Sequence, residues 1–265
     1  MRFVMPVLHR TRALGTALLL TPVFAAAAAA QAQSAAVVPA TDLPSAQGLV
    51  QKYIEASGMA RMTKQRAIHT TGTFSMPAMG ATGQVEVFQL APNRMAMKMT
   101  LPGLGDLSSG FDGETAWSMN PMEGPRVLAG AELVQIRDEA DFLASLRDAR
   151  LVASIETVEQ TEIEGRGCWK VKLSWKSGRE SFDCYDLETG MLHATMQTNI
   201  TAMGTLESLT VFTEYRDFDG VQMPTVTTQQ VFGQRLVIRI ETVQWGNVDE
   251  STVALPPEIR ALVGK

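Results

Sequence analysis

Apolar and polar residues alternate along most of the chain with a period of two, which is typical of half-buried β-strands. The alternation begins near residue 67, and turn residues, mostly glycine, separate the successive runs. We expect strands over residues 67–75, 83–90, 94–101, 107–111, 114–119, 151–163, 168–175, 179–185, 191–200, 206–218, 221–232 and 235–245.

Three segments have helical rather than strand periodicity. Ser45 can cap a helix that carries Leu49, Val50, Tyr53 and Ile54 on one stripe and stops at Gly58. Residues 131–146 form a second amphipathic pattern, and residues 255–263 predict a last short helical turn after two prolines.

The order of these elements predicts a mainly β (α+β) protein. About ten or eleven strands follow one another as an antiparallel meander, with two or three helices and no long polar linker between them. A single sheet of that size has to curve, and the helices are expected to pack against its concave face. We therefore expect one domain over residues 45–265.

The first 32 residues have the layout of a secretory signal. A basic start precedes an apolar stretch over residues 13–30, and Ala30-Gln31-Ala32 matches the small-x-small pattern of a cleavage site near Ala32. A retained membrane anchor is the alternative, although the stretch is short and interrupted by Pro22. No cysteine ends the apolar stretch, so we expect a soluble periplasmic product after a short linker over residues 33–44.

Removal of residues 1–32 takes away three basic residues and no acidic one, so the net charge of −5 becomes about −8. An acidic chain without a basic cluster is a poor partner for nucleic acid. The only cysteines, Cys168 and Cys184, lie in two runs joined by a turn near Ser177. This hairpin places them on adjacent strands, where an oxidising compartment favours a disulfide; two reduced core cysteines are the alternative.

The sequence carries no signature of an enzyme, a nucleotide cofactor or a metal site. Only His69 and His193 follow the signal, and no G-x-S-x-G, H-E-x-x-H or Walker motif occurs. The spacing of the cysteines matches no zinc site. Asp112-Gly113 and Asp219-Gly220 fit hairpin turns better than calcium loops. We expect a non-enzymatic protein without a cofactor or a metal.

Methionine is the more informative residue type, and 13 of the 15 methionines follow the signal. Because its side chain is unbranched and polarisable, a surface of methionines adapts to apolar ligands such as acyl chains. Ordinary core filling is the alternative reading. The residues that we expect to line an apolar ligand cavity are Met95, Met97, Met99, Leu101, Trp117 and Met119.

Three stretches resemble a known family when they are taken in order. They are Gly110-Phe111-Asp112-Gly113-Glu114-Thr115-Ala116-Trp117, Phe182-x-x-Tyr185-Asp186-x-Glu188-Thr189-Gly190, and Tyr215-Arg216-Asp217-Phe218-Asp219-Gly220-Val221-x-x-Pro224. Together with a helix that ends at Gly58 and a Pro92-Asn93-Arg94 turn, they resemble the periplasmic LolA/LolB-like superfamily of outer-membrane lipoprotein-sorting proteins.

The resemblance implies an unclosed antiparallel β-barrel, capped by helices, with an apolar cavity for lipid or lipoprotein acyl chains. It also implies a family arginine that helps to hold the closed state, for which Arg94 is the nearest candidate. The function expected from the resemblance is that of a monomeric carrier of lipid or lipoprotein acyl chains. An envelope membrane protein is its expected partner. The alternative is a regulatory or envelope-stress module of the same fold that binds a protein partner.

Overall fold

The computed structural model describes residues 43–201, 204–231, 233–246 and 248–264. The expected signal over residues 1–32 lies outside the described residues, and so does the expected linker except for Leu43 and Pro44. These two residues lie beside a strand, where the Thr157 hydroxyl donates to the Pro44 carbonyl oxygen at 2.7 Å.

Thirteen strands form one antiparallel sheet in the order β6-β5-β4-β3-β2-β1-β13-β12-β11-β10-β9-β8-β7. They are β1 (Ala67–Met76), β2 (Ala81–Leu90), β3 (Arg94–Leu101), β4 (Gly105–Phe111), β5 (Ala116–Asn120), β6 (Gly124–Val127), β7 (Val152–Ile163), β8 (Arg166–Trp175), β9 (Glu180–Asp186), β10 (Leu192–Thr201), β11 (Gly204–Phe218), β12 (Val221–Val231) and β13 (Gln234–Trp245). Two meanders, β1–β6 and β7–β13, therefore meet where β1 pairs with β13, and β6 and β7 are the outer strands.

Three α-helices and four short 3-10 helices complete the described part. The α-helices are α1 (Ala46–Ser57), α2 (Gly130–Ala140) and α3 (Pro257–Val263). The 3-10 helices are η2 (Met59–Lys64), η3 (Pro77–Met79), η4 (Ala144–Leu146) and η5 (Glu250–Val253). The number of α-helices agrees with the two or three that the sequence predicts. The expected cap is confirmed, because the Ser45 hydroxyl accepts from the Gly48 N–H at 3.1 Å and Gly58 ends α1 with a φ of 67°.

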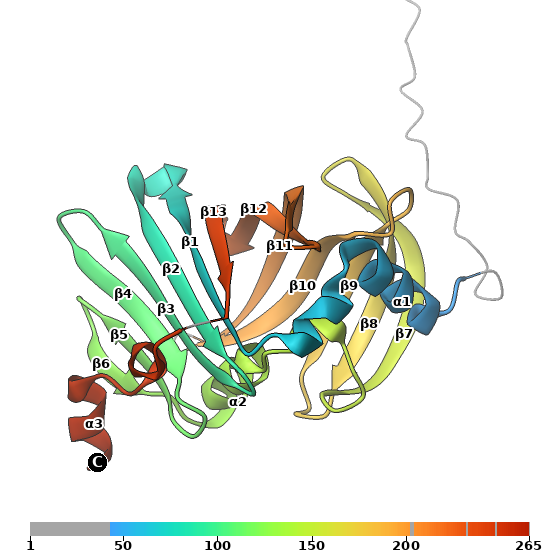
Figure 1. Cartoon of the computed structure of the whole chain (residues 1–265). Helices are drawn as coiled ribbons and strands as arrows, with labels where there is room; N and C mark the ends of the chain where they lie inside the picture. The colour runs from blue at the N-terminus through green and yellow to red at the C-terminus, as the bar shows by residue number, and fades with distance from the viewer. Residues whose placement is uncertain (1–42, 202–203, 232, 247, 265) are drawn as a thin grey trace, which may run out of the picture. The chain divides into compact units, whose positions relative to one another are not determined.

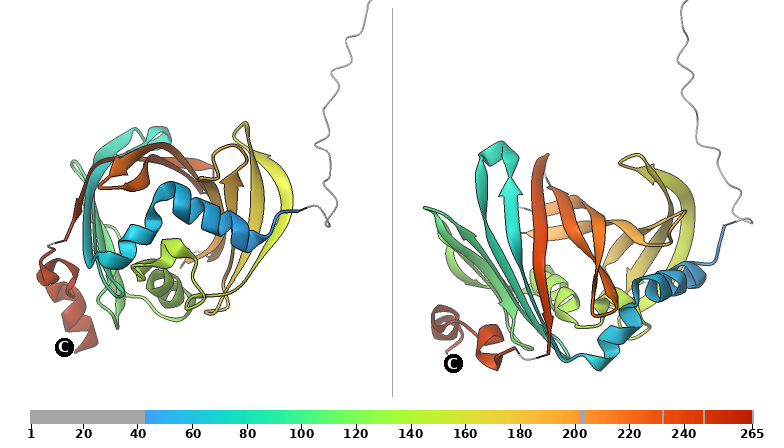
Figure 2. Two further views of the ribbon diagram at one scale, coloured as in Figure 1. Left: turned by 45° about the vertical axis from the view of Figure 1, so that its right-hand side comes forward. Right: turned by 45° about the horizontal axis from the view of Figure 1, so that its top comes forward.

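The sheet curves around α1 and α2, which lie on its concave face (Figures 1 and 2). α1 packs there with inward side chains of β8 such as Val171 and Leu173. On the convex face, η5 and α3 cover Ala96 of β3 and Trp117 of β5. The expected fold class, a strongly curved and unclosed antiparallel sheet with helices, is confirmed.

Two details of the sequence prediction are wrong. The sheet has 13 strands, so the tally of ten or eleven is too low. Each of the twelve expected ranges contains a strand, and the thirteenth, the four-residue β6, contains Pro125 and is too short for its alternation to be recognised. The expected helix over residues 131–146 ends at Ala140. There the Phe142 N–H bonds to the Pro92 carbonyl oxygen at 2.9 Å instead of continuing the helix, so a tertiary contact divides α2 from η4.

The acidic residues of the recognised stretches form turns, as expected. The Asp112 carboxylate accepts from the backbone N–H groups of Glu114 and Thr115 at 2.9 and 2.7 Å, and the Asp217 carboxylate accepts from the Gly220 N–H at 3.0 Å. The first of these turns delays β5 to Ala116, two residues later than predicted.

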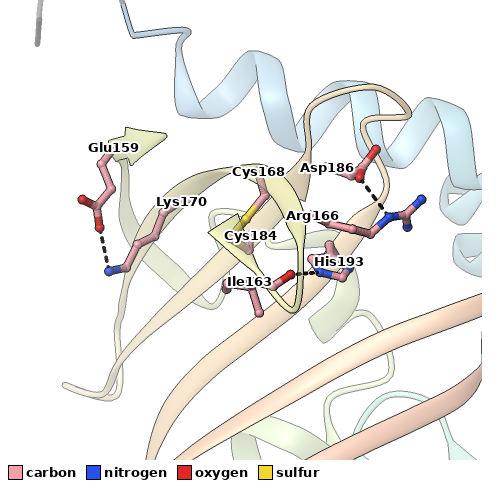
Figure 3. Close-up of a disulfide and its surroundings, with 8 residues drawn as sticks. All are labelled: Glu159, Ile163, Arg166, Cys168, Lys170, Cys184, Asp186 and His193. Atoms are coloured by element: carbon pink, nitrogen blue, oxygen red, sulfur yellow. Dashed lines mark hydrogen bonds and ion pairs between the residues drawn. A yellow bond between two sulfur atoms is a disulfide. The ribbon is translucent and has the colours of Figure 1, made fainter. Parts of the chain in front are cut away.

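Cys168 and Cys184 form the expected disulfide between β8 and β9 (Figure 3). Both are fully buried on the convex face, in a cluster with Ala194 and Val211. They lie diagonally, because Cys168 is opposite Asp186 and Cys184 is opposite Lys170 in the register of the two strands. The bond therefore staples the hairpin that carries the inward-facing residues described below.

Candidate functional site

The methionine row of β3 lies on the concave face of the sheet. In the register of β3 with its neighbours, Met95, Met97 and Met99 face the same side as Val85 and Val87 of β2. Met95 lies in one cluster with Leu133 and Ile136 of α2. Helix α2 therefore covers the start of β3 on the concave side. Met97 and Met99, further along β3, lie outside the cluster that α2 forms with Met95.

An apolar patch occupies the concave face beyond α2. Its buried members are Phe74, Val85, Met99 and Leu101, and all its members come from β1, β2, β3, β4 and β13. The half-buried members packed against them are Met76, Ala81, Val87, Met97, Leu107, Leu236 and Ile238. Half-buried apolar side chains on a concave surface retain area that a ligand can cover. We call these residues the apolar patch.

Trp117 and Met119 do not lie with this patch, which corrects the expectation that six residues line one cavity. Trp117 is opposite Gly110, which is opposite Ala96, so the side chains of Trp117 and Ala96 point to the same face, which is the convex one. There Trp117 is buried beneath η5 and α3, and Met119 packs against the same cluster. The structure therefore brings Met95, Met97, Met99 and Leu101 together and places the other two on the opposite face.

The other half of the concave face is covered by helical segments and carries a buried ion pair. Arg147, which follows η4, donates from Nε to Asp183 Oδ2 at 2.8 Å and from Nη2 to Asp183 Oδ1 at 3.3 Å. The Tyr185 hydroxyl also donates to Asp183 Oδ2, at 3.0 Å. The side chains of Arg147 and Asp183 are 15% and 1% exposed. A bidentate pair of this kind is geometrically specific.

Arg147 adopts a φ of 53°, in the left-handed region that residues other than glycine rarely occupy. Such a conformation persists where the surroundings determine it, and the contacts with Asp183 do so here. Burial alone would lower the pKa of Arg147, but the nearby Asp183 charge outweighs it and raises that pKa. The guanidinium is therefore permanently charged and held in place.

A second ion pair ties α2 to the same strands. Arg179 Nη1 lies 3.3 Å from Asp138 Oδ2, and the Ser177 hydroxyl donates to that oxygen at 2.5 Å. Both guanidinium groups, of Arg147 and Arg179, lie 5.7 Å from the centre of the Trp175 ring. We call the pairs Arg147–Asp183 and Arg179–Asp138 the clamp, because they fix residues 130–147 onto the concave face.

Three tyrosines surround the clamp and are held neutral. Burial raises the pKa of Tyr53 to about 12. Burial, followed by the charge of Asp183, raises the pKa of Tyr185 well above its ordinary value, and burial also raises the pKa of Tyr215. The rings of Tyr53 and Tyr185 are 5.8 Å apart and join α1 to β9. Helix α1 is thus anchored to the clamped half by packing.

A cavity of about 220 Å³ remains beside the clamp. It is lined by charged side chains, of Asp138, Glu139, Arg147, Arg179 and Asp183, and by apolar ones that include Trp175 and Phe212. Cavities that hold drug-sized apolar ligands are larger, about 300–1,000 Å³, and mostly apolar. This half is suited to holding the helices in place, and the apolar patch is the better candidate for a ligand site.

Sequence reasoning missed the clamp. Its signal was available, because Ser181, Asp183 and Tyr185 alternate with apolar Phe182 and Cys184, which puts a carboxylate on the covered face of a strand. Arg94, the nearest candidate for a closing arginine, instead pairs with exposed Glu250 of η5 at 3.2 Å. Arg147 and Arg179 are the arginines whose ion pairs hold helical segments on the concave face.

The histidines are apart and take structural positions. His69 on β1 stacks on Phe88 and lies 3.2 Å from Glu86, whereas buried His193 bonds through Nε2 to the Ile163 carbonyl oxygen at 2.9 Å. Within the described part of the chain, no group of three or more His, Cys, Asp or Glu side chains is placed to hold a metal ion.

Solved structures are similar to this chain at very low sequence identity. A LolA superfamily protein from Nitrosomonas europaea matches with a TM-score of 0.54 and 10% identity, covering 80% of this chain and 99% of its own. For a DUF1329 family protein from Desulfovibrio piger (TM-score 0.49, 11% identity), the match covers 77% of this chain and 96% of that protein. For an outer membrane lipoprotein-sorting protein domain from Vibrio parahaemolyticus (TM-score 0.46, 8% identity), the match covers 76% of this chain and 96% of that domain.

No protein-family model matches the sequence, and no curated protein is similar to it. The likeness in structure nevertheless shows that the chain has a LolA-like fold, as its sequence resemblance implied. Among the residues that the structure describes, no helix has the length and apolar character that a membrane crossing requires.

Proposed function

We propose that this chain is a soluble, non-enzymatic periplasmic carrier that binds the acyl chains of lipids or lipoproteins on the apolar patch. The observation that carries the proposal is the division of the concave face, where the apolar patch keeps half-buried side chains beside a half that is closed by the clamp. The signal-like start of the sequence supports the periplasmic location.

Methionine gives the patch its adaptability. Met76, Met97 and Met99 belong to it, and their flexible thioethers can repack against chains of different length and branching. Acyl chains gain about 0.8 kcal/mol for each CH₂ group removed from water, so a shallow apolar surface can bind them without a specific polar contact. Carrier binding therefore needs no catalytic group, in keeping with a non-enzymatic protein.

The test is binding of an apolar fluorescent probe and its displacement by a fatty acid. Met97→Asp places a charge on the half-buried surface of the patch and should weaken probe binding about tenfold or more. Thr100→Asp is the matched control, because Thr100 lies three residues further along β3 on the convex face. It should leave probe binding within about twofold of the unchanged protein.

Equal effects of the two substitutions, or no displaceable binding by the unchanged protein, would overturn the proposal. Mass spectrometry of lipid extracted from protein purified out of its own periplasm gives an independent check. The expected result is a retained acyl lipid that the Met97→Asp protein lacks.

A second candidate function is recognition of a protein partner, and a groove on the convex face favours it. The groove measures about 500 Å³, with Phe182, Met196 and Leu209 on its floor. Its rim includes Lys170, Glu180 and Glu207. An apolar floor with a charged rim is suited to an anchoring side chain of another protein. Loss of a co-purifying envelope protein on Met196→Asp, with probe binding intact, would support this function.

A further inference from the structure

Three alternate hairpins of the β1–β6 meander each expose one large apolar side chain at the tip. Met79 and Leu104 are both 66% exposed, and Met122 is 90% exposed. They lie in the turns β1–β2, β3–β4 and β5–β6. Folding buries most such side chains, so their recurrence at successive tips requires an explanation.

The three tips lie at the same end of the sheet. The hairpins close at the pairs Met76–Ala81, Leu101–Gly105 and Asn120–Gly124, and the six strands are neighbours in sequence order. Successive tips are two strands apart, which is about 10 Å at the usual strand spacing. They follow one another along the upper left edge of the sheet in Figure 1.

The tips share a sequence pattern that presents the apolar side chain rigidly. Each begins with a proline and reaches a glycine after the exposed residue: Pro77-Ala78-Met79-Gly80, Pro102-Gly103-Leu104-Gly105 and Pro121-Met122-Glu123-Gly124. Proline restricts the turn, and Gly80 and Gly124 adopt the positive φ that ends it. A Cβ added at Gly80, Gly103 or Gly124 would meet no atom within 4 Å, so the turns project into open space.

The opposite end of the same strands has a different character. The turns β2–β3 and β4–β5 carry Asn93, Asp112 and Glu114. In contrast, residues 77–82 and 101–105 contain no charged side chain, and the third tip, residues 121–124, contains one, Glu123, which pairs with Arg126 at 3.9 Å. One end of the meander is therefore polar and the other is tipped with apolar residues.

We propose that these three tips are a contact surface for a lipid bilayer with zwitterionic headgroups, into which Met79, Leu104 and Met122 insert. A bilayer accepts separate apolar points along a row of about 20 Å, whereas a protein pocket requires a continuous complementary patch. The net charge, −5 for the whole sequence and about −8 without residues 1–32, disfavours an anionic surface, so apolar insertion rather than charge drives the contact.

The tips also adjoin the apolar patch. Met76 and Ala81 flank the first turn and Leu101 flanks the second, and all three belong to the patch. A chain drawn from the bilayer would thus reach the patch without crossing a polar rim. This transfer step rests on the proposed carrier function, but the membrane contact itself does not.

The test is co-flotation of the full chain with phosphatidylcholine vesicles. Each of Met79→Asp, Leu104→Asp and Met122→Asp should lower the partition coefficient about tenfold, and the triple variant should stay with the soluble fraction. Leu104→Trp should retain binding, because tryptophan favours the membrane interface. Leu262→Asp, at a 56% exposed apolar position on α3, is the matched control and should have no effect. Added salt should change binding little.

A triple variant that floats like the unchanged protein, or an unchanged protein that never floats, would overturn the inference. Probe binding separates the two proposals. Vesicle binding lost in the triple variant, with probe binding retained, supports the tips as the membrane contact. Probe binding lost in Met97→Asp without loss of flotation shows that the carrier site is distinct from them.

Discussion

The two halves of the concave face differ in how they are filled. In the half formed by β1–β4 and β13, apolar side chains pack on one another, and those outside the area that α2 covers remain half-buried. In the half formed by β8–β11, α1, α2 and η4 cover the strands, and the clamp joins them by charged contacts. One curved sheet thus carries an adaptable surface beside a rigid one.

This difference indicates a division of work. Buried ion pairs specify one arrangement, because their charges have no alternative partners of equal quality. Methionine contacts specify little and tolerate rearrangement. The clamped half therefore holds residues 130–147 in place, and the apolar patch stays available for a ligand.

Asp183→Ala tests the clamp most severely and should have the largest effect. It leaves the buried guanidinium of Arg147 and the Tyr185 hydroxyl without their acceptor. We expect the free energy of unfolding, measured with urea, to fall by about 3–5 kcal/mol. Asp106→Ala, which removes an exposed ion pair with Lys98 from the other half, is the control and should cost less than about 1 kcal/mol. Similar losses in both variants would contradict the contrast between the halves.

Removal of the disulfide should have the next largest effect. Replacing Cys168 and Cys184 with alanine opens a loop with a sequence separation of 16 and should lower the free energy of unfolding by about 3 kcal/mol. Because the bond staples β8 to β9, hydrogen exchange should accelerate in those strands more than in β2 and β3. Uniform acceleration over the sheet would show that the two halves unfold as one unit.

Alkaline pH should weaken the clamped half through its tyrosines. The pKa of Tyr53 is raised to about 12 in the folded protein, above the usual value near 10, so the unfolded chain loses its phenolic proton first. The contribution to stability is complete below about pH 10 and is lost as the pH rises towards 12. Tyrosinate absorbance should therefore appear together with unfolding, and a separate early titration of buried Tyr53 would contradict this.

Ser45→Ala should have the smallest effect, since it removes one hydrogen bond at the start of α1. We expect a loss of about 1 kcal/mol in the free energy of unfolding, with probe binding unchanged. Ser45→Asp retains a capping acceptor and should restore most of the stability. A loss of probe binding in Ser45→Ala would mean that α1 contributes to the ligand site.

Local patterns predicted the strands and α1 well because their causes are local. Period-two alternation marks a strand wherever one face is buried, and Ser45 and Gly58 define α1 by their own hydrogen bonds. The end of α2 was not predictable, because it depends on a bond between Phe142 and Pro92, which are far apart in sequence. Trp117 was misplaced because alternation gives two faces without saying which one is concave.

The sequence by itself determined the class of fold, the disulfide hairpin, the turns at Asp112 and Asp217 and the shared face of Met95, Met97 and Met99. Each follows from residues near one another along the chain. Only the tertiary structure decided that β1 pairs with β13, that α2 covers part of the methionine row, and that Arg147 meets Asp183 across 36 positions. Those contacts depend on how the sheet curves and closes on its helices, and the curvature is a property of all 13 strands together.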